Sequence, residues 1–286
     1  MGVEPRSGLA GDTRRGASAT ASLYLMPGCK NANGYGLLVG LGRVANRLLR
    51  PLGYRLRPLE PTHRESFGKD ADAVIDSVRT FTMTTPARIA ALHDAVRYVV
   101  RRSVKGALVE CGVWRGGSSM AMALALMAEG VSRDIYLFDT FSGMPPPSDV
   151  DRNSLGESAK EVLLHSDPDR SLVWAKAGLE EVEQNMRSTG YDIDKVHFVS
   201  GMVEDTVPSQ APDHIAVLRL DTDWYQSTKH ELLHLYPRLA PGGVLIIDDY
   251  GDWEGARRAV DEHLASLDVP LYLHRIDATG RLLVKP

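Results

Sequence analysis

The sequence predicts an α/β protein with a doubly wound, mostly parallel sheet of seven strands. Five short apolar runs alternate with helical stretches along the chain, and this alternation is typical of a parallel sheet covered by helices on both faces. Near the end of the chain, two further apolar runs flank the turn-forming sequence DATG. This pattern predicts an antiparallel hairpin that completes the sheet.

An N-terminal extension, residues 1–66, is expected to precede one larger domain, residues 67–286. Roughly the first 30 residues show no hydrophobic period, so we interpret them as disordered or as an over-extended start. Within residues 37–50, arginines share one face of a predicted helix and apolar residues share the other. This helix could touch an anionic membrane surface, or it could pack onto the larger domain or serve as a lid.

Charge and composition limit the classes of protein to consider. Residues 1–60 carry nine Lys or Arg against three Asp or Glu, although the whole chain has a net charge of −4. No apolar run approaches the roughly 20 residues of a membrane span, and no signal peptide is evident. The two cysteines, Cys29 and Cys111, lack the partners of a disulfide framework or zinc site. We therefore expect a cytoplasmic protein with no nucleic-acid partner.

The regular elements of the larger domain follow from Thr85 onwards. A helix is expected to begin there, because a threonine cap followed by Pro86 is a typical helix start. The five expected strands are Ala107–Cys111, Ile135–Phe138, Val196–Val199, Ile215–Leu220 and Val244–Ile247. Helical periodicity covers Ser118–Ala128, Leu172–Arg187, Ser227–Leu239 and Trp253–Leu267. The closing hairpin is expected to pair Leu271–Ile276 with Arg281–Val284.

A glycine-rich turn, VECGVWRGGSS, follows the first expected strand. Its glycines let the backbone approach a ligand closely, and Ser118 or Ser119 could cap the helix that follows. The spacing differs from the G-x-G-x-x-G of a dinucleotide site, and no G-K-[ST] phosphate motif is present. The turn, with Glu110 just before its first glycine, therefore indicates either a ligand contact or simply a tight turn.

The next two strand ends also carry groups that could contact a ligand. Asp139 ends the second strand, at a place where a carboxylate can hold the two hydroxyls of a ribose. Phe141 could lie on a purine face, and Asp205, after the third strand, could accept a hydrogen bond from an exocyclic amine. Each residue alone could equally be a helix cap or part of a solvated loop. Together they match the set of contacts that a nucleoside requires.

Four motifs resemble the macrocin O-methyltransferase family, the metal-dependent sugar O-methyltransferases of macrolide and aminocoumarin biosynthesis, which have the Rossmann-like class I fold. They are VECGVWRGGSS, YLFDTFSGMPPPS, LRLDTDWYQST and LAPGGVLIIDDYGDWEGARRAV, within about residues 67–286. The resemblance implies a sugar or glycoside acceptor and a homo-oligomer. It also implies that S-adenosylmethionine is held by Glu110, Gly112, Ser118, Asp139 and Asp205, with Met83 and Thr84 near its methionyl end.

Aspartates end the fourth and fifth expected strands. Because these strands are adjacent in this fold, Asp221, Asp248 and Asp249 are expected to converge, and they would repel one another unless a cation lay between them. Oxygen ligands without His or Cys favour Mg²⁺, and the resemblance implies the same three ligands. Such an ion lowers the pKa of a sugar hydroxyl. Asp223 is the candidate base that removes its proton.

Two other functions are open at this point. Metal-dependent glycosyltransferases also use a D-x-D motif after a strand, to hold a nucleotide sugar. That function leaves the glycine turn and the pair Asp248 and Asp249 without a role. A binding protein without turnover would lack one of the metal-binding acids, and none is missing.

Overall fold

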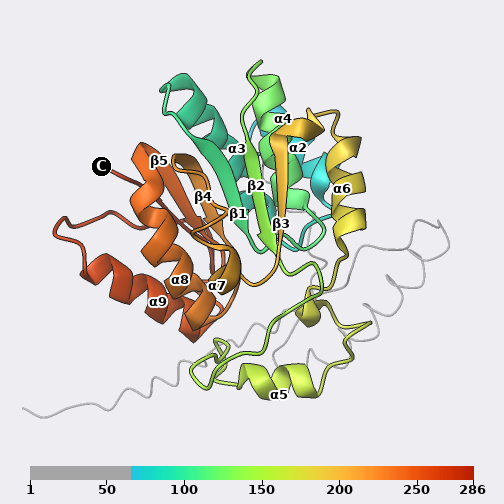
Figure 1. Cartoon of the computed structure of the whole chain (residues 1–286), viewed down its shortest axis with the longest axis vertical. Coiled ribbons are helices and arrows are strands. Elements are labelled where there is room, and N and C mark those ends of the chain that lie inside the picture. The colour runs from blue at the N-terminus through green and yellow to red at the C-terminus, as the bar shows by residue number, and fades with distance from the viewer. Residues whose placement is uncertain (1–65) are drawn as a thin grey trace, which may run out of the picture. The chain divides into compact units, whose positions relative to one another are not determined.

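The computed structural model describes residues 66–286, which form one compact unit, Ser66–Pro286 (Figure 1). The basic helix predicted within residues 37–50 lies outside the described residues. None of the helices in the described part combines the length and the apolar character that crossing a membrane requires.

Seven strands form a single sheet in the order β3-β2-β1-β4-β5-β7-β6. The first five strands pair in parallel, whereas β7 pairs antiparallel with both β5 and β6, so the predicted doubly wound sheet and closing hairpin are confirmed. The strands are β1 (Ala107–Cys111), β2 (Ile135–Asp139), β3 (Val196–Ser200), β4 (Ile215–Leu220), β5 (Leu239–Ile247), β6 (His274–Arg275) and β7 (Arg281–Val284). The order reverses between β1 and β4, and ligands of such sheets bind outside the carboxyl ends of the strands at this point.

Helices cover both faces of the sheet (Figure 1). One face carries α2 (Lys69–Val78), α3 (Pro86–Arg101), α4 (Gly117–Ala128) and α6 (Leu179–Ser188), and the other carries α7 (Val203–Thr206), α8 (Tyr225–Leu235) and α9 (Glu254–Ala265). Two separate apolar clusters result because neighbouring strand residues point to opposite faces. In β1, for example, Leu108 belongs to the first cluster and Val109 to the second.

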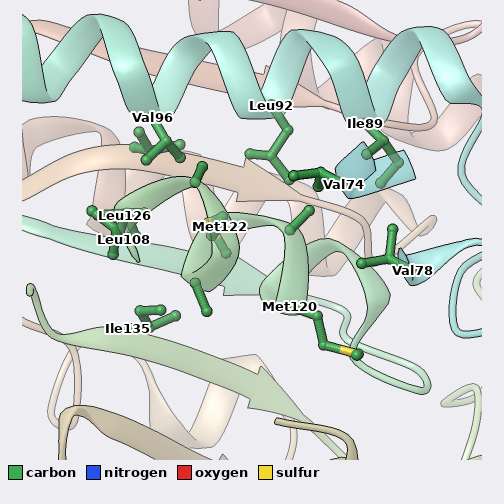
Figure 2. Close-up of a cluster of buried hydrophobic side chains, with 14 of the residues drawn as sticks. Val74, Val78, Ile89, Leu92, Val96, Leu108, Met120, Met122, Leu126 and Ile135 are labelled. Carbon is green, nitrogen blue, oxygen red and sulfur yellow. The ribbon is translucent and has the colours of Figure 1, made fainter. Parts of the chain in front are cut away.

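Helix α4 is the centre of the first cluster, and it is apolar on nearly every side. Figure 2 shows Met122 and Leu126 of α4 between Leu92 and Val96 of α3 on one side and Leu108 of β1 on the other. A helix that is covered all round needs apolar residues all round, which explains the run MAMALALMA. This packing fixes the start of α4, and with it the glycine turn before it.

One helix predicted from the sequence is wrong in part, and three helices of the structure were not predicted. The helix expected over Leu172–Arg187 is a single 3₁₀ turn, Leu172–Trp174, followed by irregular backbone and then α6. Ala175 has a φ of 42°, which is incompatible with a continuous right-handed helix. The short helices α2, α5 (Ala159–Leu164) and α7 were not expected, and β6 has only two of the six residues predicted for it.

Candidate active site

A pocket of about 360 Å³ opens at the carboxyl ends of β1, β2, β4 and β5. One side of its lining is the glycine turn with Gly112 and Ser118, and Met83 and Thr84 lie before α3. The residues predicted from sequence that line it are Met83, Thr84, Gly112, Ser118, Asp139, Asp221, Asp223, Asp248 and Asp249. The strand ends therefore bring nine of the twelve predicted site residues to one cavity.

Close contact between two strand ends forms the floor of this pocket. Gly112 has a φ of +80°, and a Cβ atom on it would lie only 1.9 Å from the backbone oxygen of Asp221. The Asp221 N–H donates to the Cys111 carbonyl at 2.8 Å, which holds the two loops together. Only glycine fits at position 112, because any side chain would push the end of β1 away from the end of β4.

Asp139 organises the glycine turn from the neighbouring strand. Its carboxylate accepts hydrogen bonds from the backbone N–H groups of Val113 (2.6 Å), Trp114 (3.1 Å) and Phe141 (2.7 Å). Burial raises the pKa of Asp139, and these three donors oppose the rise. The residue therefore shapes the turn and also lines the pocket.

Glu110 lies beneath the pocket and is absent from its lining. Its carboxylate pairs with Arg219 of β4 at 2.6 Å and also accepts a hydrogen bond from Ser119. Burial raises the pKa of Glu110 to about 7, although Arg219 opposes this rise. This geometry differs from the direct cofactor contact predicted from sequence, because both carboxylate oxygens are occupied by protein partners.

Three carboxylates converge at the ends of β4 and β5. One oxygen each from Asp221, Asp223 and Asp249 lies within 4.8 Å of the others. Burial, and then the Asp221 carboxylate, raise the pKa of Asp223 to about 8. The pKa of Asp249 lies well above its ordinary value, first because of burial and then because of Asp223. Such crowding is relieved when a cation shares the carboxylates, so the residues present fit a hard divalent ion.

Asp248 occupies a different position from the one expected of a metal ligand. One of its oxygens lies 2.6 Å from Arg219 Nη2, and the other pairs with Arg88 of α3. Burial raises the pKa of Asp248 to about 6, while Arg219 and Arg88 oppose the rise. In this arrangement Asp223, and not Asp248, completes the cluster with Asp221 and Asp249.

The model of the macrocin-O-methyltransferase (TylF) family matches residues 53–285. The chain belongs to this family. Demethyldecarbamoylnovobiocin O-methyltransferase of Streptomyces niveus is 36% identical over 233 residues, 77% of this chain and 85% of that protein. Mycinamicin III 3''-O-methyltransferase of Micromonospora griseorubida is 36% identical over 200 residues, 70% of this chain and 76% of that protein. The structure of the O-methyltransferase NovP superposes with a TM-score of 0.63 and 32% identity, covering 86% of this chain and 98% of that chain.

Membership of the macrocin-O-methyltransferase family makes this chain an O-methyltransferase and sets aside the glycosyltransferase alternative. The family match begins at residue 53, within the N-terminal extension expected from sequence, and the boundary at residues 66 and 67 stays a prediction. The fold and the family support S-adenosylmethionine as the methyl donor.

Two predicted donor contacts of this methyltransferase lie away from the pocket. Phe141 is only 9% exposed and packs in the first apolar cluster, so its ring is not available to a purine. Asp205 is exposed on α7, and its neighbour Glu204 lines the pocket in its place. In a helix of four residues, a shift of one position turns a side chain by about 100°. The sequence pattern does not show which of the two neighbouring acids, Glu204 or Asp205, faces the pocket.

Sequence reasoning also missed Arg88, Trp114 and Arg219, all of which line the pocket. The signal for Arg219 was present, since a single arginine within the apolar strand Ile215–Leu220 needs buried acidic partners. Arg88 gave no comparable signal, because its position in α3 is also that of an ordinary exposed helix residue.

Proposed function

We propose that this protein is a Mg²⁺-dependent O-methyltransferase that moves a methyl group from S-adenosylmethionine to a sugar hydroxyl of a glycosylated natural product or glycan intermediate. The observation that carries the proposal is the convergence of Asp221, Asp223 and Asp249 in the pocket that the glycine turn also lines. The related enzymes named above, which act on glycosylated antibiotics, support the sugar acceptor.

Asp221 and Asp249 are the proposed metal-binding residues. When bound, Mg²⁺ would lower the pKa of a coordinated sugar hydroxyl and fix its position. Asp248 is the third ligand predicted from sequence, but it can reach the ion only by leaving Arg219 and Arg88. The present geometry therefore supports Asp221 and Asp249 more strongly than Asp248.

Asp223 is the proposed general base. Its carboxylate lies beside the two proposed ligands, so it can accept the proton of a hydroxyl that they orient. The pKa of Asp223 is about 8 in the cluster without a cation. A cation shared with Asp221 and Asp249 would lower this pKa, so that the Asp223 carboxylate is ionised at neutral pH.

The donor is proposed to lie along the glycine turn. Gly112 allows the backbone to approach it, and Ser118, Asp139 and the pair Met83 and Thr84 present polar and apolar groups to it. Glu110 would act indirectly, by holding Arg219 and the end of β1. In-line alignment of the methyl group with the acceptor oxygen can contribute about 7 to 11 kcal/mol towards lowering the barrier.

The cellular location, the oligomeric state and the acceptor class are also proposals. We expect a cytoplasmic enzyme that assembles as a homo-oligomer and acts on a small-molecule acceptor. Contact with a membrane surface through residues 37–50 can be tested by liposome co-sedimentation of the full chain and of a variant without residues 1–60.

Methyl transfer from labelled S-adenosylmethionine to a panel of deoxysugar glycosides, read by mass spectrometry, tests the proposal. We expect a labelled product that disappears with EDTA and returns with Mg²⁺. Asp223→Asn should retain binding of S-adenosylhomocysteine and lose about 10²- to 10⁴-fold in turnover. S-adenosylhomocysteine should raise the melting temperature of the parent, whereas UDP should not. Turnover that is indifferent to EDTA would refute the metal dependence.

A further inference from the structure

Asp223 lies at the centre of a strained turn. Its φ is +63°, a left-handed value that non-glycine residues rarely adopt. The N–H of Trp224 donates to the carbonyl of Thr222 at 2.6 Å, which closes a three-residue turn around Asp223. Such a conformation is unfavourable and persists only where surrounding contacts enforce it. The direction of the Asp223 carboxylate therefore depends on groups that hold the residues on either side.

Helix α8 supplies one set of these contacts. The Thr222 hydroxyl donates to the buried carboxyl group of Glu231 at 3.1 Å, and the Ser227 hydroxyl donates to the Thr222 carbonyl at 3.3 Å. These contacts fix the residue before Asp223. The same helix also holds the Trp224 carbonyl, which accepts hydrogen bonds from the Ser227 hydroxyl and the Thr228 N–H, both at 3.1 Å.

The loop between β2 and α5 supplies the other set. The indole N–H of Trp224 donates to the carbonyl of Pro145 at 2.9 Å. The backbone N–H of Tyr225, the first residue of α8, donates to Asp151 Oδ1 at 2.8 Å. Two consecutive residues after Asp223 are thus tied to one loop that lies far from them in sequence.

Asp151 is the residue of this loop that is buried and hydrogen-bonded through both of its carboxylate oxygens. Its side chain is fully buried, and its second oxygen accepts hydrogen bonds from the Ser148 backbone N–H (2.7 Å) and hydroxyl (2.6 Å). A Cβ atom on Gly255, in the first turn of α9, would lie 2.0 Å from Asp151 Oδ1. The carboxylate is therefore packed against the starts of both α8 and α9, where the helix dipoles favour negative charge.

We propose that Asp151 is a positioning residue that holds Asp223 in its strained turn and so keeps its carboxylate beside Asp221 and Asp249. Asp151 touches neither donor nor acceptor in this role and acts through Tyr225, while its loop also holds Trp224 through the Pro145 carbonyl. The inference rests on the proposed function, since it takes the aspartate cluster as the metal-binding and base site. An asparagine at position 151 would present a donor to the Ser148 N–H group or to the Tyr225 N–H group, and one of the two hydrogen bonds would be lost.

Binding of Mn²⁺, used as a probe ion, and of S-adenosylhomocysteine tests this role by calorimetry on the full chain. In Asp151→Asn we expect Mn²⁺ to bind about tenfold more weakly, as for other groups that orient ligands, with unchanged affinity for S-adenosylhomocysteine. Asp149→Asn is the matched control, because Asp149 is in the same loop with a side chain that is 92% exposed. It should behave as the parent. Unchanged Mn²⁺ affinity in Asp151→Asn, or an equal loss for both probes, overturns the inference.

A second variant covers the case in which Asp151→Asn does not fold. Trp224→Phe keeps an aromatic ring against Trp253 and removes only the N–H that reaches Pro145, so it should show the same selective loss of Mn²⁺. Hydrogen exchange of the metal-free proteins provides a readout independent of any ion. Peptides covering residues 222–228 should exchange faster in the variants, while residues 112–120 stay unchanged. Equal exchange in both regions overturns the inference, whereas a parent that binds neither probe refutes only the proposed function.

Discussion

The guanidinium group of Arg219 lies 2.6 Å from the Glu110 carboxylate, and both side chains are almost completely buried beneath the pocket. The same guanidinium reaches Asp221 at 2.7 Å and Asp248 at 2.6 Å. One arginine in β4 thus joins the ends of three neighbouring strands, β1, β4 and β5. The network places one buried guanidinium among three carboxylates beneath the pocket.

Replacing Arg219 should be costly. Arg219→Met leaves the buried carboxyl groups of Glu110 and Asp248 without their shared cation, and removing one partner of a buried ion pair costs about 3 to 5 kcal/mol. Urea unfolding should show this loss. Arg258→Met is the control, because Arg258 pairs with Glu262 on the surface of α9, and it should change the free energy of unfolding far less. Equal losses in the two variants would contradict the role of the network.

Gly112→Ala should separate steric from conformational effects when it is compared with Gly156→Ala. Both glycines have a φ of +80°, but a Cβ at Gly156 meets nothing within 4 Å. Gly156→Ala should cost about 1 to 2 kcal/mol from the left-handed backbone alone. Gly112→Ala should cost more and should also weaken S-adenosylhomocysteine binding, because β1 and β4 must move apart. Unfolding curves and calorimetry measure the two effects.

Asp249→Asn should mainly affect metal binding, whereas Asp248→Asn should mainly affect stability. Asp249 belongs to the carboxylate cluster, so its loss should weaken Mn²⁺ binding by about tenfold or more with little effect on stability. Asp248 pairs with two arginines, so its loss should mainly lower the free energy of unfolding. Calorimetry with Mn²⁺ and urea unfolding of each variant provide the check. A large loss of Mn²⁺ affinity in Asp248→Asn with unchanged stability would instead make Asp248 a ligand.

Glu129 should make stability depend on pH in the acid range. Hydrogen bonds from Arg101 and Arg97 lower the pKa of Glu129 to about 2, from an ordinary value of 4.5. A lowered folded-state pKa contributes stability that is present above pH 4.5 and is lost as the pH falls towards 2. The difference in unfolding free energy between the parent and Glu129→Gln should therefore shrink between pH 7 and pH 3. A constant difference would argue against this ion pair.

The sheet could be predicted from sequence because its signals are local. Ala107–Cys111 and Ile215–Leu220 are buried along their whole length, so an apolar run marks each strand. Their adjacency, which brings Asp221 and Asp249 together, follows from the doubly wound order. The helix predicted from Leu172 onwards was wrong over the segment from Leu172 to Gly178. Its apolar residues Leu172 and Val173 line the pocket and do not form a helix interface.

The remaining differences between expectation and structure concern pairs of residues that are distant in sequence. Asp248 was expected to be free for a metal ion, and nothing in the pattern indicates that Arg88, 160 residues away, reaches it. The contact of Asp151 with the start of α8 could not be predicted from the sequence either, because the loop that carries Asp151 has no hydrophobic periodicity. Local patterns locate the strand ends, whereas the partner of each charged group depends on the folded chain.

Asp277, in the turn between β6 and β7, accepts a hydrogen bond from the Thr85 hydroxyl at 2.6 Å and pairs with Arg88 at 3.1 Å. Strand β7 lies between β5 and β6 in the sheet. The turn of the hairpin therefore holds Arg88 in place at the pocket, where Arg88 also pairs with Asp248. A variant that lacks this turn would keep every aspartate of the pocket but lose the contact that orients Arg88.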